Sequence, residues 1–315
     1  MRAASRALAA FAATALITSL AACGSQAGSP PAARPAGAAA AFPVTLTTAI
    51  GPVKVRARPG AIMSLSPAVT EMLYAIGAGG QVKAVDSDSD YPPQAPRTKL
   101  SGFSPNVEAI AARKPDLVVV SYSAASLARQ LAPFSIPVLD LPAPTTLSGV
   151  YREFTELGRA TGHLAAAQRE SASLRTQLAA IAAAVPHHSA PVTYYYELDP
   201  SHYSLTSATF AGRLLAMLGM KSIADTASGA AAAGGYPQLS AEYVLKAHPD
   251  YVILADTICC RQNAGTVAKR PGWAALSAVK SGHVIALNDD IASRWGPRIV
   301  NLLRTVAGAL KNGGQ

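Results

Sequence analysis

The chain has 315 residues and a formal net charge of +9, but only 14% of its residues are charged, against roughly 25% in ordinary domains. No run of Lys and Arg with interleaved aromatic residues occurs, which argues against nucleic-acid binding. The G-x-S-x-G, H-E-x-x-H and G-x-x-x-x-G-K-[ST] patterns are also missing, so an exported enzyme is the less favoured class. The net positive charge could favour binding of an anionic ligand or of an anionic membrane surface. It is equally consistent with ordinary background composition and no anionic partner.

Residues 1–22 predict a signal peptide. Two arginines precede an apolar stretch that is too short to span a bilayer as a mature helix. The stretch ends in Leu-Ala-Ala-Cys-Gly, which resembles a bacterial lipobox with Cys23 as the lipidated first residue of the mature protein; the alternative is an ordinary signal peptide with a chance Cys. Residues 23–43, rich in Ala, Gly, Pro and Ser, predict a flexible tether. We therefore expect an exported protein, lipid-anchored on the outer face of the cytoplasmic membrane.

An N-terminal α/β lobe is predicted over residues 44–146. Alternating polar and apolar residues around Gly51-Pro52 predict a hairpin at its start. Strands and helices then alternate, which favours a parallel sheet. Strands are expected at 61–65, 82–85, 117–120 and 137–141, and helices at 68–76, between Asn106 and Pro115, and at 124–132.

The longest helical pattern runs over residues 147–186, although Gly158 and Gly162 weaken its first half. One long helix between two lobes acts as a strut and predicts a rigid connection. The C-terminal α/β lobe is predicted over residues 187–315. Its strands are expected at 192–198, 251–255 and 284–287, and its helices at 208–218, after Ser240, and at 297–310.

Two distant stretches repeat one pattern. Asn106 and Ser240 each cap a predicted helix two positions before a Glu, Glu108 and Glu242, and each helix leads through Pro-Asp into a buried strand. The repeat predicts two Rossmann-like lobes with parallel sheets and a ligand cleft between them. The two carboxylates form a matched pair that suits docking to a two-fold partner, although each also suits its helix dipole.

The adjacent Cys259 and Cys260 predict a vicinal disulfide, because the chain is exported and no other thiol is available to either residue. Two free thiols and a metal site are the alternatives. No His or acidic residue lies near the pair at the spacing of metal ligands, so we expect no metal there.

The two Glu…Pro-Asp units and three further motifs resemble a known family. The three motifs are S-L-S-P-A-V-T-E from Ser64, S-D-S-D-Y-P-P from Ser87, and S-R-W-G-P-R from Ser293. They resemble the class III substrate-binding proteins of ABC importers, which have a helical connector, and among these the cobalamin-binding branch. The resemblance covers about residues 44–310. It implies a monomer that binds cobalamin, or alternatively a ferric siderophore or haem, as transported ligand rather than cofactor. It also implies that Glu108 and Glu242 dock to arginines on the two permease subunits.

Ligands of open parallel sheets bind at the carboxyl ends of the strands, which selects the cleft loops. Aromatic residues recur in these loops and suit a large planar ligand. The candidate ligand-binding residues are Ser66, Pro67, Ala68, Tyr91, Phe103 and Tyr122 in the first lobe, and His202, Tyr203, Tyr236, Arg294 and Trp295 in the second.

Several of these residues also have structural interpretations. Tyr91 suits turn packing, and Phe103 suits a hydrophobic staple before the repeated helix. His202 is the one histidine on an expected cleft loop, where it suits an axial ligand to cobalt or haem iron. The other histidines fall outside these loops, so the sequence predicts no transition-metal site.

Overall fold

The computed structural model describes residues 42–186 and 189–313. The predicted signal peptide, Cys23 and most of the predicted tether lie outside the described residues. The described part contains two parallel four-stranded sheets, so the predicted α/β fold with two lobes is confirmed. No helix within it has the length and apolar character needed to cross a membrane.

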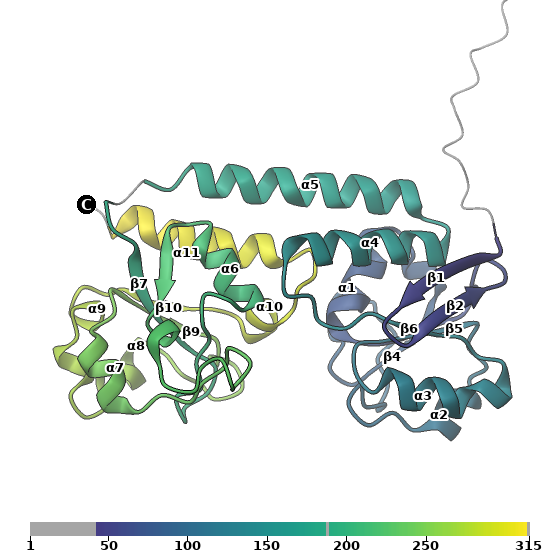
Figure 1. Cartoon of the computed structure of the whole chain (residues 1–315), viewed down its shortest axis with the longest axis horizontal. Helices are drawn as coiled ribbons and strands as arrows, with labels where there is room; N and C mark the ends of the chain where they lie inside the picture. The colour runs from purple at the N-terminus through teal and green to yellow at the C-terminus, as the bar shows by residue number, and fades with distance from the viewer. Residues whose placement is uncertain (1–41, 187–188, 314–315) are drawn as a thin grey trace, which may run out of the picture. The chain divides into compact units, whose positions relative to one another are not determined.

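The N-terminal lobe holds a sheet with the strand order β4-β3-β5-β6 (Figure 1). Successive residues of β5 belong to different buried clusters: Val119 shares one with Val69 of α1, and Val118 shares the other with Leu127 of α3. Burial on both faces explains the continuous apolar run of this strand. The strands are β3 (Ile62–Leu65), β4 (Val82–Val85), β5 (Leu117–Val120) and β6 (Val138–Asp140), and the helices are α1 (Pro67–Ala75), α2 (Val107–Ala111) and α3 (Ala124–Leu131).

The C-terminal lobe repeats this topology in the order β8-β7-β9-β10. Its strand β8 is absent from the sequence prediction, because three residues with one exposed Lys give too short a pattern to detect. The strands are β7 (Val192–Glu197), β8 (Met220–Ser222), β9 (Tyr251–Leu254) and β10 (Val284–Ala286). The helices are α6 (Phe210–Ala216), α7 (Ala241–Ala247), α8 (Ala264–Ala268), α9 (Ser277–Lys280), α10 (Asp289–Ser293) and α11 (Ile299–Asn312).

The predicted hairpin is β1 (Val44–Thr48) paired antiparallel with β2 (Gly51–Val55). It packs against α4 rather than extending the parallel sheet. Leu46 and Val55 contribute to the buried core, so the hairpin is an integral part of the N-terminal lobe.

The repeated sequence pattern has the same structural role in both lobes. The Asn106 side chain accepts the amide of Ala109 at 2.7 Å at the start of α2, and the Ser240 hydroxyl accepts the amide of Tyr243 at 3.1 Å at the start of α7. Each side chain therefore satisfies an amide of the first helical turn that has no partner within the helix.

The Asp of each Pro-Asp pair ties one strand to its neighbour. Asp116 accepts the amides of Gly60 and Ala61 at 2.8 and 2.9 Å, just before β3. Asp250 accepts the amide and the hydroxyl of Thr193 at the start of β7, both at 2.7 Å. In the N-terminal lobe this carboxylate fixes the start of β3 against β5, and in the C-terminal lobe it fixes the start of β7 against β9. The shared structural role explains why the Pro-Asp pair occurs in both lobes.

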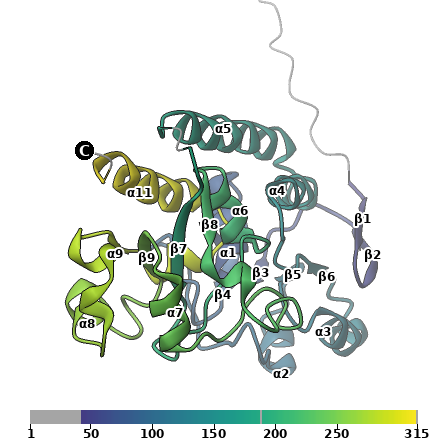
Figure 2. The ribbon, with the colours of Figure 1, turned by 60° about the vertical axis from the view of Figure 1, so that its left-hand side comes forward.

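The connection between the lobes consists of two helices, so the prediction of one helix over residues 147–186 is wrong. The first helix, α4 (Leu147–Thr161), ends at Gly162, whose φ of 78° lies in the left-handed region that favours glycine. The second helix, α5 (Leu164–Ala183), starts after His163 and packs on both α4 and α11 (Figures 1 and 2).

One apolar core runs from lobe to lobe beneath the connector. It contains Val69 of α1, Phe154 of α4, Leu174 of α5 and Leu303 of α11, all buried. Moving the lobes apart would expose part of this core to water, at a cost of about 25 cal/mol for each Å² of apolar surface. The packing therefore supplies the stiffness that a single helix was expected to provide.

Candidate ligand-binding site

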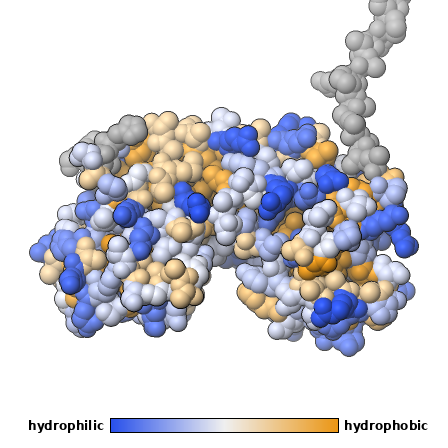
Figure 3. All heavy atoms as spheres, viewed as in Figure 1, coloured by the Kyte–Doolittle hydropathy of each residue, from blue (hydrophilic) through white to orange (hydrophobic). Residues whose placement is uncertain are grey.

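The loops after the strands of both lobes enclose a hollow of about 270 Å³. Figure 3 shows the surface hollowed between the lobes, on the side away from α5. The lining residues of the N-terminal lobe are Leu65, Ser66, Pro67, Ala68, Asp86, Asp88, Gly102, Phe103 and Tyr122, and those of the C-terminal lobe are Asp290, Ser293, Arg294 and Trp295. Seven of these thirteen residues are among the predicted ligand-binding residues, and the other six are Leu65, Asp86, Asp88, Gly102, Asp290 and Ser293.

Phe103 and Tyr122 form an exposed aromatic pair on this hollow. Their ring centroids are 4.9 Å apart, and the residues are 62% and 44% exposed. The preceding Gly102 lets the loop approach β3 closely, because a Cβ atom there would lie 2.7 Å from the carbonyl oxygen of Leu65. Rings held in this way offer a flat apolar wall to a ligand.

Polar groups at the start of α1 form the base of the same hollow. Pro67 is the first residue of α1, where its missing amide proton costs no hydrogen bond. The hydroxyl of Ser121, after β5, donates to the hydroxyl of Ser66 at 2.9 Å. Three predicted residues, Ser66, Pro67 and Ala68, therefore lie together with the aromatic pair.

A second, larger hollow of about 890 Å³ adjoins Tyr236. Thr206 also lines it, and the Thr206 hydroxyl is buried without a hydrogen-bond partner among the described residues. Burial and then the charge of the neighbouring Tyr122 raise the pKa of Tyr236. The sequence prediction included Tyr236 but missed Thr206, whose short polar side chain carries no pattern.

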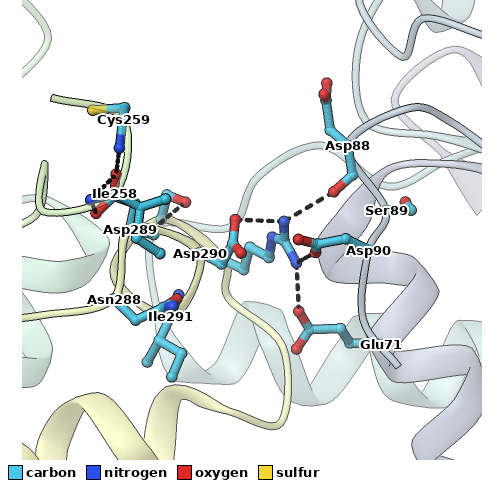
Figure 4. A network of polar contacts seen from close by, with 12 residues as sticks. Glu71, Asp88, Ser89, Asp90, Ile258, Cys259, Asn288, Asp289, Asp290 and Ile291 are labelled. Carbon is cyan, nitrogen blue, oxygen red and sulfur yellow. Dashed lines mark hydrogen bonds and ion pairs between the residues drawn. The ribbon is translucent and has the colours of Figure 1, made fainter. Parts of the chain in front are cut away.

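Arg294 joins the lobes through a cluster of ion pairs (Figure 4). Its guanidinium lies 3.2 Å from Glu71, 2.8 Å from Asp90 and 2.6 Å from Asp290, and it donates to the carbonyl oxygen of Asp88 at 2.9 Å. These partners already neutralise the charge of Arg294, which the sequence predicts as a ligand-binding residue. Arg294 lines the hollow, but its main role in this structure is to connect the lobes.

Tyr91 belongs to the same connection and lies away from both hollows of the cleft. The guanidinium of Arg298 lies 4.2 Å from the centre of the Tyr91 ring and also binds Glu71 at 2.9 and 2.6 Å. Tyr91 instead lines a separate hollow of about 360 Å³ beside α5 and α11. The structure thus favours the packing interpretation of Tyr91.

Trp295 is buried at the edge of the smaller hollow, and its indole N–H donates to Glu153 of α4 at 2.8 Å. Burial raises the pKa of Glu153 to about 8, so the carboxyl is largely protonated at neutral pH. The indole is therefore fixed by the connector, and only part of it is available to a ligand.

His202 and Tyr203 lie away from both hollows. His202 stacks on the buried Trp273 with ring centroids 5.7 Å apart, and its backbone lies in the left-handed region with a φ of 67°. Tyr203 is 42% exposed and pairs through its backbone with Gln238. The rule that placed both residues at the cleft identifies a loop correctly, but it does not give the direction of each side chain.

Asp86 is a cleft residue that the sequence reasoning missed. It accepts the amides of Ser89 and Asp88 at 2.8 and 3.1 Å, and burial raises its pKa. Asp86 directly follows β4, so the same strand-end rule would have found it.

Cys259 and Cys260 are free thiols, which contradicts the predicted disulfide. Their loop forms a helical turn, in which the amide of Cys260 donates to the carbonyl oxygen of Asp256, and adjacent side chains of such a turn do not face each other. Asp289 holds the turn by accepting the amides of Ile258 and Cys259 at 3.0 and 2.8 Å. Within residues 42–186 and 189–313 no group of three His, Cys, Asp or Glu side chains could hold a metal ion.

Glu108 and Glu242 lie in the first turns of α2 and α7, and both are exposed. The backbone amide of Glu242 and the hydroxyl of Ser240 lower the pKa of Glu242, so this carboxylate stays charged at neutral pH. The two residues occupy equivalent places in the two lobes.

Comparison with known proteins agrees with this architecture. A cobalamin-binding protein of Halobacterium salinarum is 32% identical over 307 residues, which cover 94% of this chain and 82% of the relative. An uncharacterized ABC transporter substrate-binding lipoprotein of Bacillus subtilis, YvrC, is 29% identical over 276 residues, 84% of this chain and 85% of the relative. The crystal structure of the periplasmic vitamin B12-binding protein BtuF of Vibrio cholerae aligns with a TM-score of 0.67 and 26% identity, covering 82% of this chain and 99% of that one.

Two parallel α/β lobes joined by helices, with hollows between their strand ends, define a solute-binding protein. The sequence profile described as periplasmic binding protein matches residues 62–291, and the chain belongs to this family.

Proposed function

We propose that this protein is an extracytoplasmic lipoprotein that captures cobalamin or a related corrinoid in its interlobe cleft and delivers it to an ABC importer. The aromatic groups of the cleft carry the proposal. Phe103 and Tyr122 on one lobe and Tyr236 on the other provide ring surfaces on both sides of a large flat ligand. The names of the Halobacterium and Vibrio relatives support the corrinoid class.

The polar groups of the cleft suit the amide side chains of a corrinoid. The unpartnered Thr206 hydroxyl can donate to or accept from an amide, and the nearby Arg213 adds further donors on the larger hollow. None of the residues that line the two hollows is a histidine, which gives less support to a histidine-ligated haem. The corrinoid is transported ligand and undergoes no reaction.

Calorimetric titration tests the ligand class. We expect cobalamin or cobinamide to bind with a dissociation constant of about 1 μM or tighter, which corresponds to about −8 kcal/mol, and to be recovered unchanged. Because Trp295 lines the smaller hollow, we expect its fluorescence to be quenched on binding. No heat with either corrinoid, together with binding of haem or a ferric siderophore, would replace cobalamin with that ligand. Conversion of the bound compound would instead indicate an enzyme.

Anchoring through Cys23 is a separate part of the proposal. Mass spectrometry of the protein extracted from host membranes should find a lipid-modified Cys23 at the N-terminus. The Cys23→Ala variant should be missing from the washed membrane fraction. A mature N-terminus at another residue, with unmodified Cys23 removed, would contradict the anchor and leave the ligand proposal intact.

A further inference from the structure

The N-terminal lobe has a further hollow, of about 880 Å³, that takes no part in the cleft. It adjoins the segments that precede β5 and β6, at the amino ends of these strands, whereas the cleft forms at their carboxyl ends. Its lining residues are Lys54, Val55, Arg56, Ala57, Arg58, Ala111, Lys114, Pro115, Asp116, Ala132, Phe134, Ser135, Ile136 and Pro137. We call this set of residues the basic groove.

Three cations of the basic groove are available to a partner. Lys54, Arg56 and Lys114 are exposed, and none forms an ion pair with a residue that the structure describes. Arg58 is different, because its guanidinium donates to the carbonyl oxygen of Thr161 at 3.1 Å and lies against His163. The single acid of the groove, Asp116, is occupied by the two amides at the start of β3.

Phe134 adds an apolar group to these cations. It is 57% exposed and ends a short 3₁₀ turn, Ala132–Phe134. Ser135 follows with a φ of 58°, so the chain reverses direction just after the ring. An exposed ring on a tight turn, beside unpaired cations, matches the pattern of side chains that insert at a membrane interface.

The groove also lies beside the N-terminal attachment of the lobe. Lys54 of β2 pairs with Thr45 of β1, and β1 is the first strand of the described chain. Whatever precedes the hairpin must therefore join the lobe next to the groove. A segment that tethers the chain to a membrane would bring the cations close to the lipid headgroups.

We propose that the basic groove is a docking surface for anionic phospholipids. Lys54, Arg56 and Lys114 contact the headgroup phosphates, and Phe134 enters the interfacial layer. Each basic residue near an anionic surface strengthens binding about fivefold, so the three together contribute about 100-fold. Lipid binding by the basic groove does not depend on the identity of the cleft ligand.

Vesicle binding of the full chain tests the proposal. We compare the parent with Lys54→Gln/Arg56→Gln/Lys114→Asn, in which Asn suits the left-handed backbone of residue 114. The control, Lys221→Gln/Lys269→Gln/Lys280→Gln, removes three exposed cations from the other lobe. All three proteins share residues 1–41, so binding through that segment is common to them. On vesicles with phosphatidylglycerol in phosphatidylcholine, the groove variant should bind about 100-fold more weakly and the control should match the parent.

Depth of insertion gives a second readout. In a Phe134→Trp variant, lipids brominated in their acyl chains should quench the added fluorescence on anionic vesicles but not on pure phosphatidylcholine. The native Trp273 and Trp295 are 1% and 9% exposed, so the parent provides a low background. Equal vesicle binding of the groove variant and the parent would overturn the proposal. So would equal quenching on neutral and anionic vesicles.

Discussion

At the scale of single residues, the exposed pair Phe103 and Tyr122 gives the most direct test of the cleft. Stacking on an aromatic ring contributes about 0.5–1.5 kcal/mol beyond the apolar area that it buries. We expect Phe103→Ala and Tyr122→Ala each to weaken corrinoid binding about tenfold in calorimetry. Phe134→Ala is the matched control, because Phe134 is equally exposed but lies outside the cleft, and it should retain parental affinity. If Phe103→Ala binds the corrinoid as tightly as the parent does, the Phe103 ring does not contact the ligand.

Glu153 predicts a pH dependence of stability. Its pKa rises from the ordinary 4.5 to about 8, so between these values the folded protein holds a proton that the unfolded chain releases. The free energy of unfolding should therefore fall as the pH increases through this window. Glu153→Gln keeps an acceptor for Trp295 but does not titrate. Between pH 5 and pH 8 the free energy of unfolding of this variant should therefore fall by about 3 kcal/mol less than that of the parent, measured by urea unfolding.

Comparison of the variant with the parent separates the pH dependence caused by Glu153 from that caused by other buried acids. Burial raises the pKa of Asp256 to about 7, but this contribution is present in both proteins and cancels in their comparison. Glu108→Gln, at an exposed position, should follow the parent at every pH. The same decline in Glu153→Gln as in the parent would show that Glu153 is charged in the folded state.

At the scale of elements, the segment between β10 and α11 holds the lobes together. Removing one partner of a buried ion pair leaves uncompensated charge and costs about 3 kcal/mol. We expect Arg294→Ala to lose about 2–3 kcal/mol in urea unfolding, since Arg298 still binds Glu71 and the other two carboxylates are partly exposed. Arg304→Ala, on the exposed side of α11, should change stability by less than about 0.5 kcal/mol. Equal stability of the two variants would mean that the apolar core alone joins the lobes.

The elements themselves were largely predictable from periodicity and caps. The strand over residues 82–85 matches its prediction, and most other strands and helices differ by one or two residues at their ends. The failures have local causes. Strand β8 is too short to carry a period, and Gly162 ends a helix whose apolar pattern continues beyond it into α5.

At the scale of the whole molecule, Glu108 and Glu242 place one exposed carboxylate on each lobe, and we propose that this pair docks to a two-fold permease. Charged pairs across such an interface fix register and increase the rate of encounter. We expect Glu108→Ala/Glu242→Ala to bind ligand within about threefold of the parent, because neither residue lines a hollow of the cleft. The double variant should nevertheless lose ligand uptake and stimulation of the transporter ATPase.

The matched control for docking is Glu156→Ala/Glu170→Ala, which removes the same charge from the two connector helices. It should support parental uptake. If the Glu108/Glu242 variant also supports full uptake, the two residues serve only to stabilise the first turns of their helices.

The sequence by itself determined the two-lobe architecture. A helix cap, a helix, a Pro-Asp pair and a buried strand occur in the same order in both halves, and each of these features depends on interactions between residues close together in the chain. It also identified the loops at the strand ends that form the cleft. Only the tertiary structure decided which side chains of these loops are free. Arg294 is paired by Glu71 and Asp90, more than 200 positions away in the chain, and His202 turns onto Trp273. Such partners meet only when the lobes pack, so no local pattern encodes them.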